Sequence, residues 1–214
     1  MSILRLWPVA ALGAAVLSSP VQAALPESGP YATLSGGHAR NRYDVAQPDS
    51  LLAGSGATSI VSNLDRAAGS YAAHLGYQFN RNLALEGGYV SLGRNTYNAS
   101  FTGGTANTVI KSSGPELSGL GMVPINDDID VFGRAGAVAT NTRSTAIVSG
   151  LANGNVLNAG ERKLSPELGI GLDYGFTRSM ALRAEAERVY GVGDGSRNVK
   201  GNIDLVTVGL KFAF

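Results

Sequence analysis

The sequence predicts an all-β chain that folds as an eight-stranded antiparallel up-and-down transmembrane β-barrel. Segments of about ten residues alternate apolar with small or polar residues, the length that a tilted strand needs to cross a bilayer. The connections between them alternate between short polar turns and longer stretches. No long segment has apolar residues at i, i+3, i+4 and i+7, and no window after the amino terminus approaches the roughly 18 apolar residues of a membrane helix. These observations leave strands as the only regular structure.

Residues 1–23 have the pattern of a secretory signal peptide. Arg5 supplies the positive start, Val9 to Leu17 form a short apolar core, and Val21-Gln22-Ala23 gives a small-residue cleavage pattern. The barrel domain is therefore expected to span 24–214. An uncleaved anchoring helix is the alternative, but the apolar stretch is well short of the roughly 20 residues that such a helix needs.

The charge balance and the absence of cysteine narrow the function classes. The chain has 17 Lys+Arg against 16 Asp+Glu, so loss of Arg5 with the signal peptide leaves a formal net charge of zero. A balanced charge argues against a nucleic-acid partner, which calls for a basic stripe. Without Cys there are no disulfides, thiolate metal sites or Cys nucleophiles, which is compatible with export.

The final segment has the clearest alternation. One face carries Val206, Val208, Leu210, Phe212 and Phe214; the other carries Leu205, Thr207, Gly209, Lys211 and Ala213. Large apolar residues on one face, with glycine and a lysine on the other, indicate a barrel that is apolar outside and polar inside. Ordinary strands of a soluble sandwich are the alternative.

The same division recurs in five earlier segments, at 70–79, 83–92, 129–140, 167–176 and 180–190. Phe132 is an exception, because it falls on the inward face. The segments at about 30–41 and 115–124 alternate poorly, and their faces stay open.

The connections predict the topology. Short polar turns fall at 80–82, 126–128 and 177–179, and longer loops rich in Gly, Asn, Ser and Thr at about 42–68, 95–113, 141–162 and 191–202. In outer-membrane barrels short turns face the periplasm and long loops face outward. Tyr89, Tyr97 and Tyr190 are expected to form an aromatic belt toward the long-loop end.

Several short motifs resemble the outer-membrane protein A family across 24–214. They are Pro124–Gly136 around the central turn, Leu85–Tyr89, Gly171–Tyr174, Ala181–Glu185 and the carboxyl-terminal Val208–Phe214. The resemblance implies a barrel in the outer membrane of a Gram-negative-type bacterium, surrounded by lipid and lipopolysaccharide. It also implies periplasmic chaperones and the barrel-assembly machinery as partners, the latter reading an assembly signal at Val208, Leu210, Phe212 and Phe214.

In that family, inward charges pair across the lumen and block or gate a narrow passage. The positions that match are Glu86 on the third strand, Asp173 on the sixth and Arg183 on the seventh. The family's basic residue on the fourth strand has no match, since that region reads Ser118-Gly119-Leu120-Gly121. The family's peptidoglycan-binding domain is also unmatched, so a cell-wall anchoring role is not transferred.

The inward charges are the best candidate site. They are Glu86, Arg134, Glu167, Asp173, Arg183, Glu185, Glu187 and Lys211. Unpaired charges in a narrow lumen would each cost several kcal/mol, so a network is expected, with Lys211 near the acids of the seventh strand. The network would be either a gate for water and small ions or a plug that fixes the register of the strands, and we favour the plug.

No enzymatic signature stands out, and we expect no catalytic, metal or cofactor site. His38 and His74 have no Ser at i+2, although Ser70 and His74 share a face. Gly191–Gly195 resembles a phosphate cradle, but no helix follows it.

Two functions stay open. One is a structural barrel that maintains membrane integrity, with or without a narrow gated pore. The other is surface adhesion or host interaction through the long loops.

Overall fold

The computed structural model describes residues 27–42, 58–59, 61–64, 67–150, 156–192 and 201–214. The signal-peptide prediction for 1–23 lies outside these residues. The described strands are β1 (Gly29–Arg42), β2 (Val61–Leu64), β3 (Ala67–Asn80), β4 (Leu83–Phe101), β5 (Gly104–Pro124), β6 (Ile129–Ser149), β7 (Val156–Thr177), β8 (Met180–Val192) and β9 (Gly201–Ala213). No helix among the described residues is long and apolar enough to cross a membrane.

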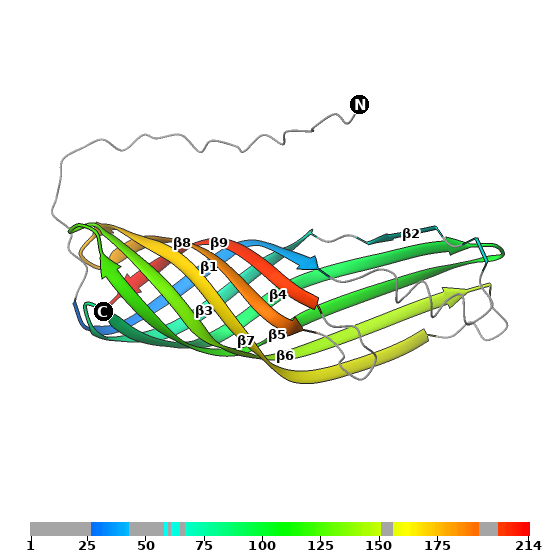
Figure 1. The fold of residues 1–214 in the computed structure, drawn as a ribbon, viewed down its shortest axis with the longest axis horizontal. Coiled ribbons are helices and arrows are strands. Elements are labelled where there is room, and N and C mark those ends of the chain that lie inside the picture. Colours follow the sequence, from blue (N-terminus) through cyan, green and yellow to red (C-terminus); the bar gives the residue numbers. More distant parts are fainter. Residues whose placement is uncertain (1–26, 43–57, 60, 65–66, 151–155, 193–200) are drawn as a thin grey trace, which may run out of the picture.

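Eight of these strands close into an antiparallel barrel (Figure 1). Going round it, the order is β4, β3, β1, β9, β8, β7, β6 and β5, and pairing of β5 with β4 completes the circle. The first barrel strand, β1, pairs with the last strand, β9, on one side and with β3 on the other. Tyr31, for example, stands opposite Ala213 on β9 and opposite Gly76 on β3. The short strand β2 is an addition that pairs only with the far end of β4. The expected fold is confirmed.

The short turns lie where the sequence predicts them, and asparagine side chains hold two of them. Asn80 Oδ1 accepts hydrogen bonds from the backbone N–H groups of Asn82 and Leu83, at 2.8 and 3.0 Å. Asn126 Oδ1 does the same for Asp128 and Ile129, at 2.9 and 2.8 Å. Asparagine favours such turns because its side chain replaces a backbone acceptor.

The predicted lipid-facing and lumen-facing sides are confirmed on the strands that alternate clearly. On β7, Leu168, Ile170, Leu172 and Phe176 are exposed on the outer wall, while Glu167 and Asp173 are buried. On β9, Val206, Val208 and Phe214 are exposed, and Lys211 is buried. β1 and β5 also alternate, with Tyr31 and Thr33 inward on β1, and Glu116 and Ser118 inward on β5.

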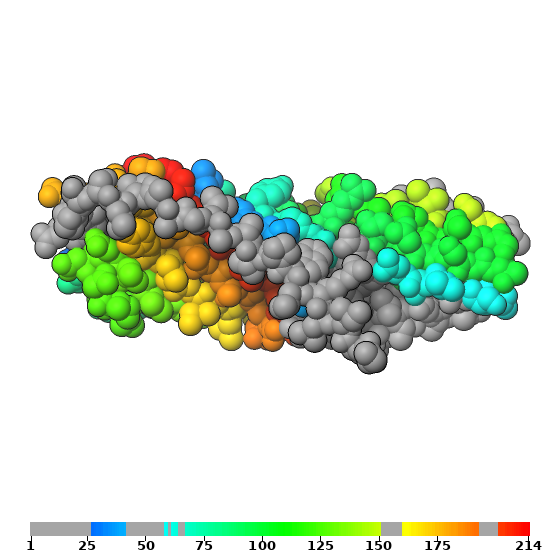
Figure 2. Space-filling view, turned by 90° about the horizontal axis from the view of Figure 1, so that it is seen from above, coloured from blue at the N-terminus to red at the C-terminus, as the bar shows by residue number. Residues whose placement is uncertain are grey.

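The prediction of a loop is wrong for two of the four long connections. The stretches 95–113 and 141–162 mostly continue the strands, so that β4, β5, β6 and β7 contain 19, 21, 21 and 22 residues. These strands run far beyond the barrel wall as two long hairpins, and β2 lies along the edge formed by β4 (Figures 1 and 2). The part of β4–β7 beyond the barrel is called the protruding sheet below.

The protruding sheet has a small core of its own. Tyr97, Ala99, Phe101 and Ala106 are buried together, with Val148 packed against them. Tyr97 is only 4% exposed, so its expected place in an aromatic belt is wrong. β4 enters the sheet through a register shift between Ser91 and Arg94, where Gly93 has a φ of +90° that favours glycine.

Candidate functional site: a charged lumen

All eight charged residues that the sequence places in the lumen face inward. Seven are at most 9% exposed, and Glu187 is half-buried. Every one stands on the lumen side because it occupies the alternate position to a lipid-facing residue on its strand. The residues are Glu86 on β4, Arg134 on β6, Glu167 and Asp173 on β7, Arg183, Glu185 and Glu187 on β8, and Lys211 on β9.

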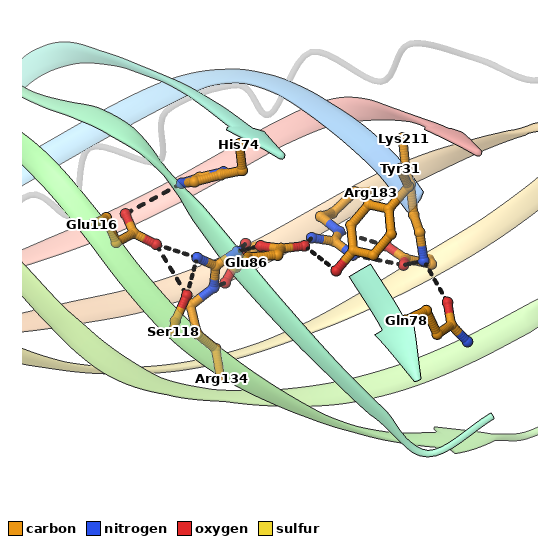
Figure 3. Close-up of polar contacts among 11 residues, drawn as sticks. Tyr31, His74, Gln78, Glu86, Glu116, Ser118, Arg134, Arg183 and Lys211 are labelled. Carbon is orange, nitrogen blue, oxygen red and sulfur yellow. Dashed lines mark hydrogen bonds and ion pairs between the residues drawn. The ribbon is translucent and has the colours of Figure 1, made fainter. Parts of the chain in front are cut away.

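Six of these residues form a continuous chain of ion pairs across the barrel (Figure 3). Arg183 holds Asp173 in a two-point contact, with Nε–Oδ1 at 2.7 Å and Nη2–Oδ2 at 2.8 Å. Its Nη1 donates to Glu86 Oε1 at 2.6 Å. The other Glu86 oxygen accepts from Arg134 Nη2 at 2.5 Å. Glu86 is therefore shared by two arginines.

Arg134 reaches two further acids. Its Nε lies 2.6 Å from Glu185 Oε1, and its Nη1 donates to Glu116 Oε1. Charge-assisted contacts of this kind offset the loss of hydration only when most donors and acceptors are used. Arg134 meets that condition through Nη1, which donates to Glu116, and Nη2, which donates to Glu86 and Glu185.

Lys211 does not pair with the acids of β8 as expected. Its Nζ lies 3.2 Å from Asp173 Oδ2 on β7 and 3.5 Å from Gln78 Oε1 on β3. Directly across from Lys211 on β8 stands Ala181, so the neighbouring strand offers no acid at that level. The long lysine side chain extends to the next strand instead.

Glu116 is the acid that the sequence reasoning missed. It stands on the fourth barrel strand, β5, is 5% exposed and contacts both Arg134 and His74, whose Nε2 lies 3.3 Å from Glu116 Oε2. The available signal is the alternation of Glu116, Ser118, Leu120 and Met122 with Leu117, Gly119, Gly121 and Val123. This alternation is weak because two of the four outward positions, 119 and 121, are glycine.

Tyr31 is a second missed residue. Its hydroxyl donates to Glu86 Oε1 at 2.8 Å, and its ring centre lies 4.5 Å from Lys211 Nζ. It lies on β1, one of the two strands whose faces the sequence leaves open.

Three acids form a cluster of carboxyl groups. Carboxylate oxygens of Glu116, Glu167 and Glu187 lie within 4.8 Å of one another, a set that could hold a metal ion. Within the described part of the chain, neither oxygen of Glu167 has a hydrogen-bond partner. The lumen therefore separates into a paired region around Glu86 and an under-compensated region around Glu167.

Two apolar clusters pack inside the lumen beside the ion pairs. Toward the short turns, Phe132 packs with Tyr31, Ala84, Leu120 and Met122. This explains the inward phenylalanine, which lies 4.5 Å beneath the Arg183 guanidinium and needs the room that Gly171 leaves. Toward the long hairpins a larger cluster contains Ala39, Ala72, Val90, Leu92, Val138, Val189, Val192, Ile203 and Leu205.

The two histidines do not form a catalytic pair with serine. Ser70 Oγ has no hydrogen-bond partner among the described residues, and neither has His74 Nδ1. His38 is exposed on the outer wall. The expectation of no enzymatic function stays a prediction.

The family model for the OmpA-like transmembrane domain matches residues 37–214. Outer membrane protein A of Serratia marcescens is 30% identical over 143 residues, which cover 66% of this chain and 38% of that protein. The protein of the same name from Yersinia pseudotuberculosis is 31% identical over 148 residues, or 66% of this chain and 39% of that protein. The chain thus matches less than half the length of these relatives.

Two solved structures share the fold at low sequence identity. Neisserial surface protein A has a TM-score of 0.54 at 14% identity, covering 88% of this chain and 99% of that one. Ail, the attachment invasion locus protein of Yersinia pestis, has a TM-score of 0.51 at 16% identity, covering 86% and 99%. Together with the closed barrel, the matches show that the chain belongs to the OmpA-like transmembrane domain family and lies in the outer membrane of a Gram-negative bacterium.

Proposed function

We propose that the chain is a structural, non-enzymatic component of the outer membrane whose lumen is kept closed. The observation that carries this proposal is the layered lumen. The chain of ion pairs from Lys211 to Glu116 fills the lumen beside one apolar cluster toward the long hairpins, and it packs against Tyr31 and Phe132 of a second cluster toward the short turns. An ion that entered would have to displace buried side chains and break charge pairs on its way.

The packing at the short-turn end supports the same proposal. The cavity beside Tyr31, Gln78 and Lys211 has a volume of about 10 Å³, enough for about one water molecule. Eight strands generally leave room for little more than side chains in a barrel.

Planar-bilayer recording on the refolded chain tests the closed lumen. We expect no conductance steps from the wild type, and none from Phe176→Ala, a control on the lipid-facing wall. Regular single-channel steps from the wild type at neutral pH would contradict a permanent plug.

A gated pore is the finer variant of this proposal. It is favoured by the position of Glu86, which pairs with both Arg183 and Arg134. Each arginine also has another acid: Asp173 pairs with Arg183, and Glu116 and Glu185 pair with Arg134. One pair can therefore break while each arginine keeps a partner. Conductance that appears in Glu86→Ala and is absent from the wild type would favour the gate; silence in both would exclude it.

A membrane-integrity role is tested in cells. Deletion of the gene should make the bacterium leak periplasmic protein and take up large antibiotics, and the wild-type chain should restore the barrier. A variant with the hairpin tips shortened should restore it equally, if the barrel rather than the protruding sheet carries this role.

Surface adhesion is a second candidate, favoured by the protruding sheet. The strands of β4–β7 are about twice the length needed to cross a bilayer, so much of them stands beyond it. Ail, which shares the fold, was solved in complex with the heparin analogue sucrose octasulfate. Cells with shortened hairpins should then bind heparin-coated or host-cell surfaces less than wild type; equal binding would count against adhesion.

A further inference from the structure

The outer wall of the protruding sheet carries four basic residues in one row. Arg94 on β4 stands directly opposite Lys111 on β5, and Lys111 stands directly opposite Arg143 on β6. Arg162 on β7 stands opposite Asn141, two residues from Arg143 on the same face. Directly opposite residues in antiparallel strands share a face, and all four side chains are exposed. They are called the basic row below.

The basic row continues the lipid-facing wall. Lys111 lies on the same face of β5 as Leu117, and Arg162 lies on the same face of β7 as Leu164 and Leu168. These three leucines are 60%, 69% and 55% exposed. Arg162 is two residues beyond Leu164, which is about 5 Å along the membrane normal for a strand tilted by about 40°. Arg162 therefore lies just above the apolar band, and Arg143, Lys111 and Arg94 continue the row across the neighbouring strands on the side of the long hairpins.

Among the residues that the structure describes on β4–β7, none compensates the charge of this row on its own face. Every acid on the described parts of β4–β7 occupies a position on the lumen side: Glu86, Glu116, Asp130, Glu161, Glu167 and Asp173. Cations directly opposite one another on neighbouring strands repel and destabilise the pairing. An anionic partner on the outer face would remove that repulsion.

The same rim on the other side of the barrel gives a contrast. On β8, Arg188 is also on the outer wall, but its Nε lies 2.5 Å from Asp204 Oδ1 on β9. Arg188 therefore has an acid from the protein itself, as the basic row does not.

We propose that the basic row binds the phosphate groups of lipopolysaccharide in the outer leaflet. Arginine and lysine are the side chains best suited to phosphate, and the row lies at the level where headgroups meet the apolar band. The acyl chains of the same lipid would lie against the apolar wall on the membrane side of the row, which contains Leu164 and Leu168 on β7 and Leu117 on β5. Because a soluble polyanion would not need the apolar wall beneath the row, the position favours a lipid.

The test measures binding of the refolded chain to detergent micelles that contain diphosphoryl lipid A, with dephosphorylated lipid A as the comparison. Wild type should bind the diphosphoryl form about tenfold more tightly or better, as expected for two charge-assisted contacts of modest net strength. Equal binding of both lipids by the wild type would overturn the proposal without any variant.

Variants then locate the site. Lys111→Gln/Arg143→Gln should lose most of the preference for the phosphorylated lipid, while Arg188→Gln should keep it. Heat-modifiable migration on gels checks that each variant is folded. An equal loss in Arg188→Gln would mean general charge attraction rather than this row and would overturn the site. Soluble heparin that binds through Lys111 and Arg143, with no lipid A preference, would assign the row to a glycan instead.

Discussion

Glu86 Oε1 and Arg183 Nη1 lie 2.6 Å apart, although β4 and β8 stand on opposite sides of the barrel. Three strands separate them in either direction around the wall. The two side chains therefore span the lumen, and at 0% and 1% exposure both are fully buried. This contact ties together strands that share no backbone hydrogen bond, so it constrains the shape of the whole barrel.

Replacing Glu86 with glutamine should lower the free energy of unfolding by about 3 kcal/mol. The change keeps the shape of the side chain but leaves Arg183 and Arg134 without their shared anion, and breaking a buried ion pair costs about 3–5 kcal/mol. Urea unfolding of the refolded barrel in detergent measures the effect. An unchanged unfolding midpoint would mean that Asp173, Glu116 and Glu185 fully compensate the two arginines.

Replacing Glu167 with glutamine should raise the free energy of unfolding, the opposite of the effect expected for Glu86→Gln. Glu167 is 1% exposed, close to Glu116 and Glu187, and its oxygens have no hydrogen-bond partner in the described part of the chain. A glutamine amide offers two donors to the carboxyl groups of Glu116 and Glu187 and cannot repel them, so the replacement should raise the unfolding midpoint. The same urea titration, run beside Glu86→Gln, measures both variants. A midpoint that falls in Glu167→Gln would show that this carboxylate has a stabilising partner, such as a bound cation.

Truncating Phe132 to alanine should destabilise the barrel and still leave it electrically silent. Loss of a buried phenylalanine costs about 3–5 kcal/mol, and here the lost contacts include Tyr31, Leu120 and Met122. The ion pairs and the second apolar cluster remain in place. Bilayer recording on folded Phe132→Ala protein should therefore give no steps; conductance would mean that this cluster alone closes the lumen.

The membrane-embedded half of the fold could be predicted from the sequence, and the reason is visible on β7. Between Glu167 and Phe176 lipid selects Leu168, Ile170, Leu172 and Tyr174 on one side, and the lumen selects charge and glycine on the other. Two such different surroundings impose a strict period of two. Where glycine replaces the outward residues, as at Gly119 and Gly121, that period weakens and Glu116 is missed.

The members of the lumen site could be predicted, but their partners could not. Alternation assigns Asp173 and Lys211 to the lumen from their own strands alone. Their contact depends on how far the strands are staggered around the closed barrel, which brings Ala181 rather than an acid opposite Lys211. Local sequence carries little information on that stagger.

The long hairpins were missed for a related reason, because above the membrane both faces of a strand are free to be polar. The pattern is still present in Tyr97, Ala99 and Phe101, which alternate with Asn98 and Ser100, but it covers one short stretch. Gly, Asn, Ser and Thr in the same stretch are typical of loops.

Hydrogen exchange on the refolded barrel should distinguish hairpins from loose loops. The amides of 95–101 and 105–111 that point into the β4–β5 ladder should exchange at least about a hundredfold more slowly than unstructured peptide. Tyr97→Ala, which removes the largest side chain of the local core, should speed exchange there and leave Leu168–Tyr174 protected. If the wild-type amides between 95 and 111 exchange as fast as unstructured peptide, this stretch is a loop, as the sequence predicts. The protruding sheet could then serve neither lipid binding nor adhesion.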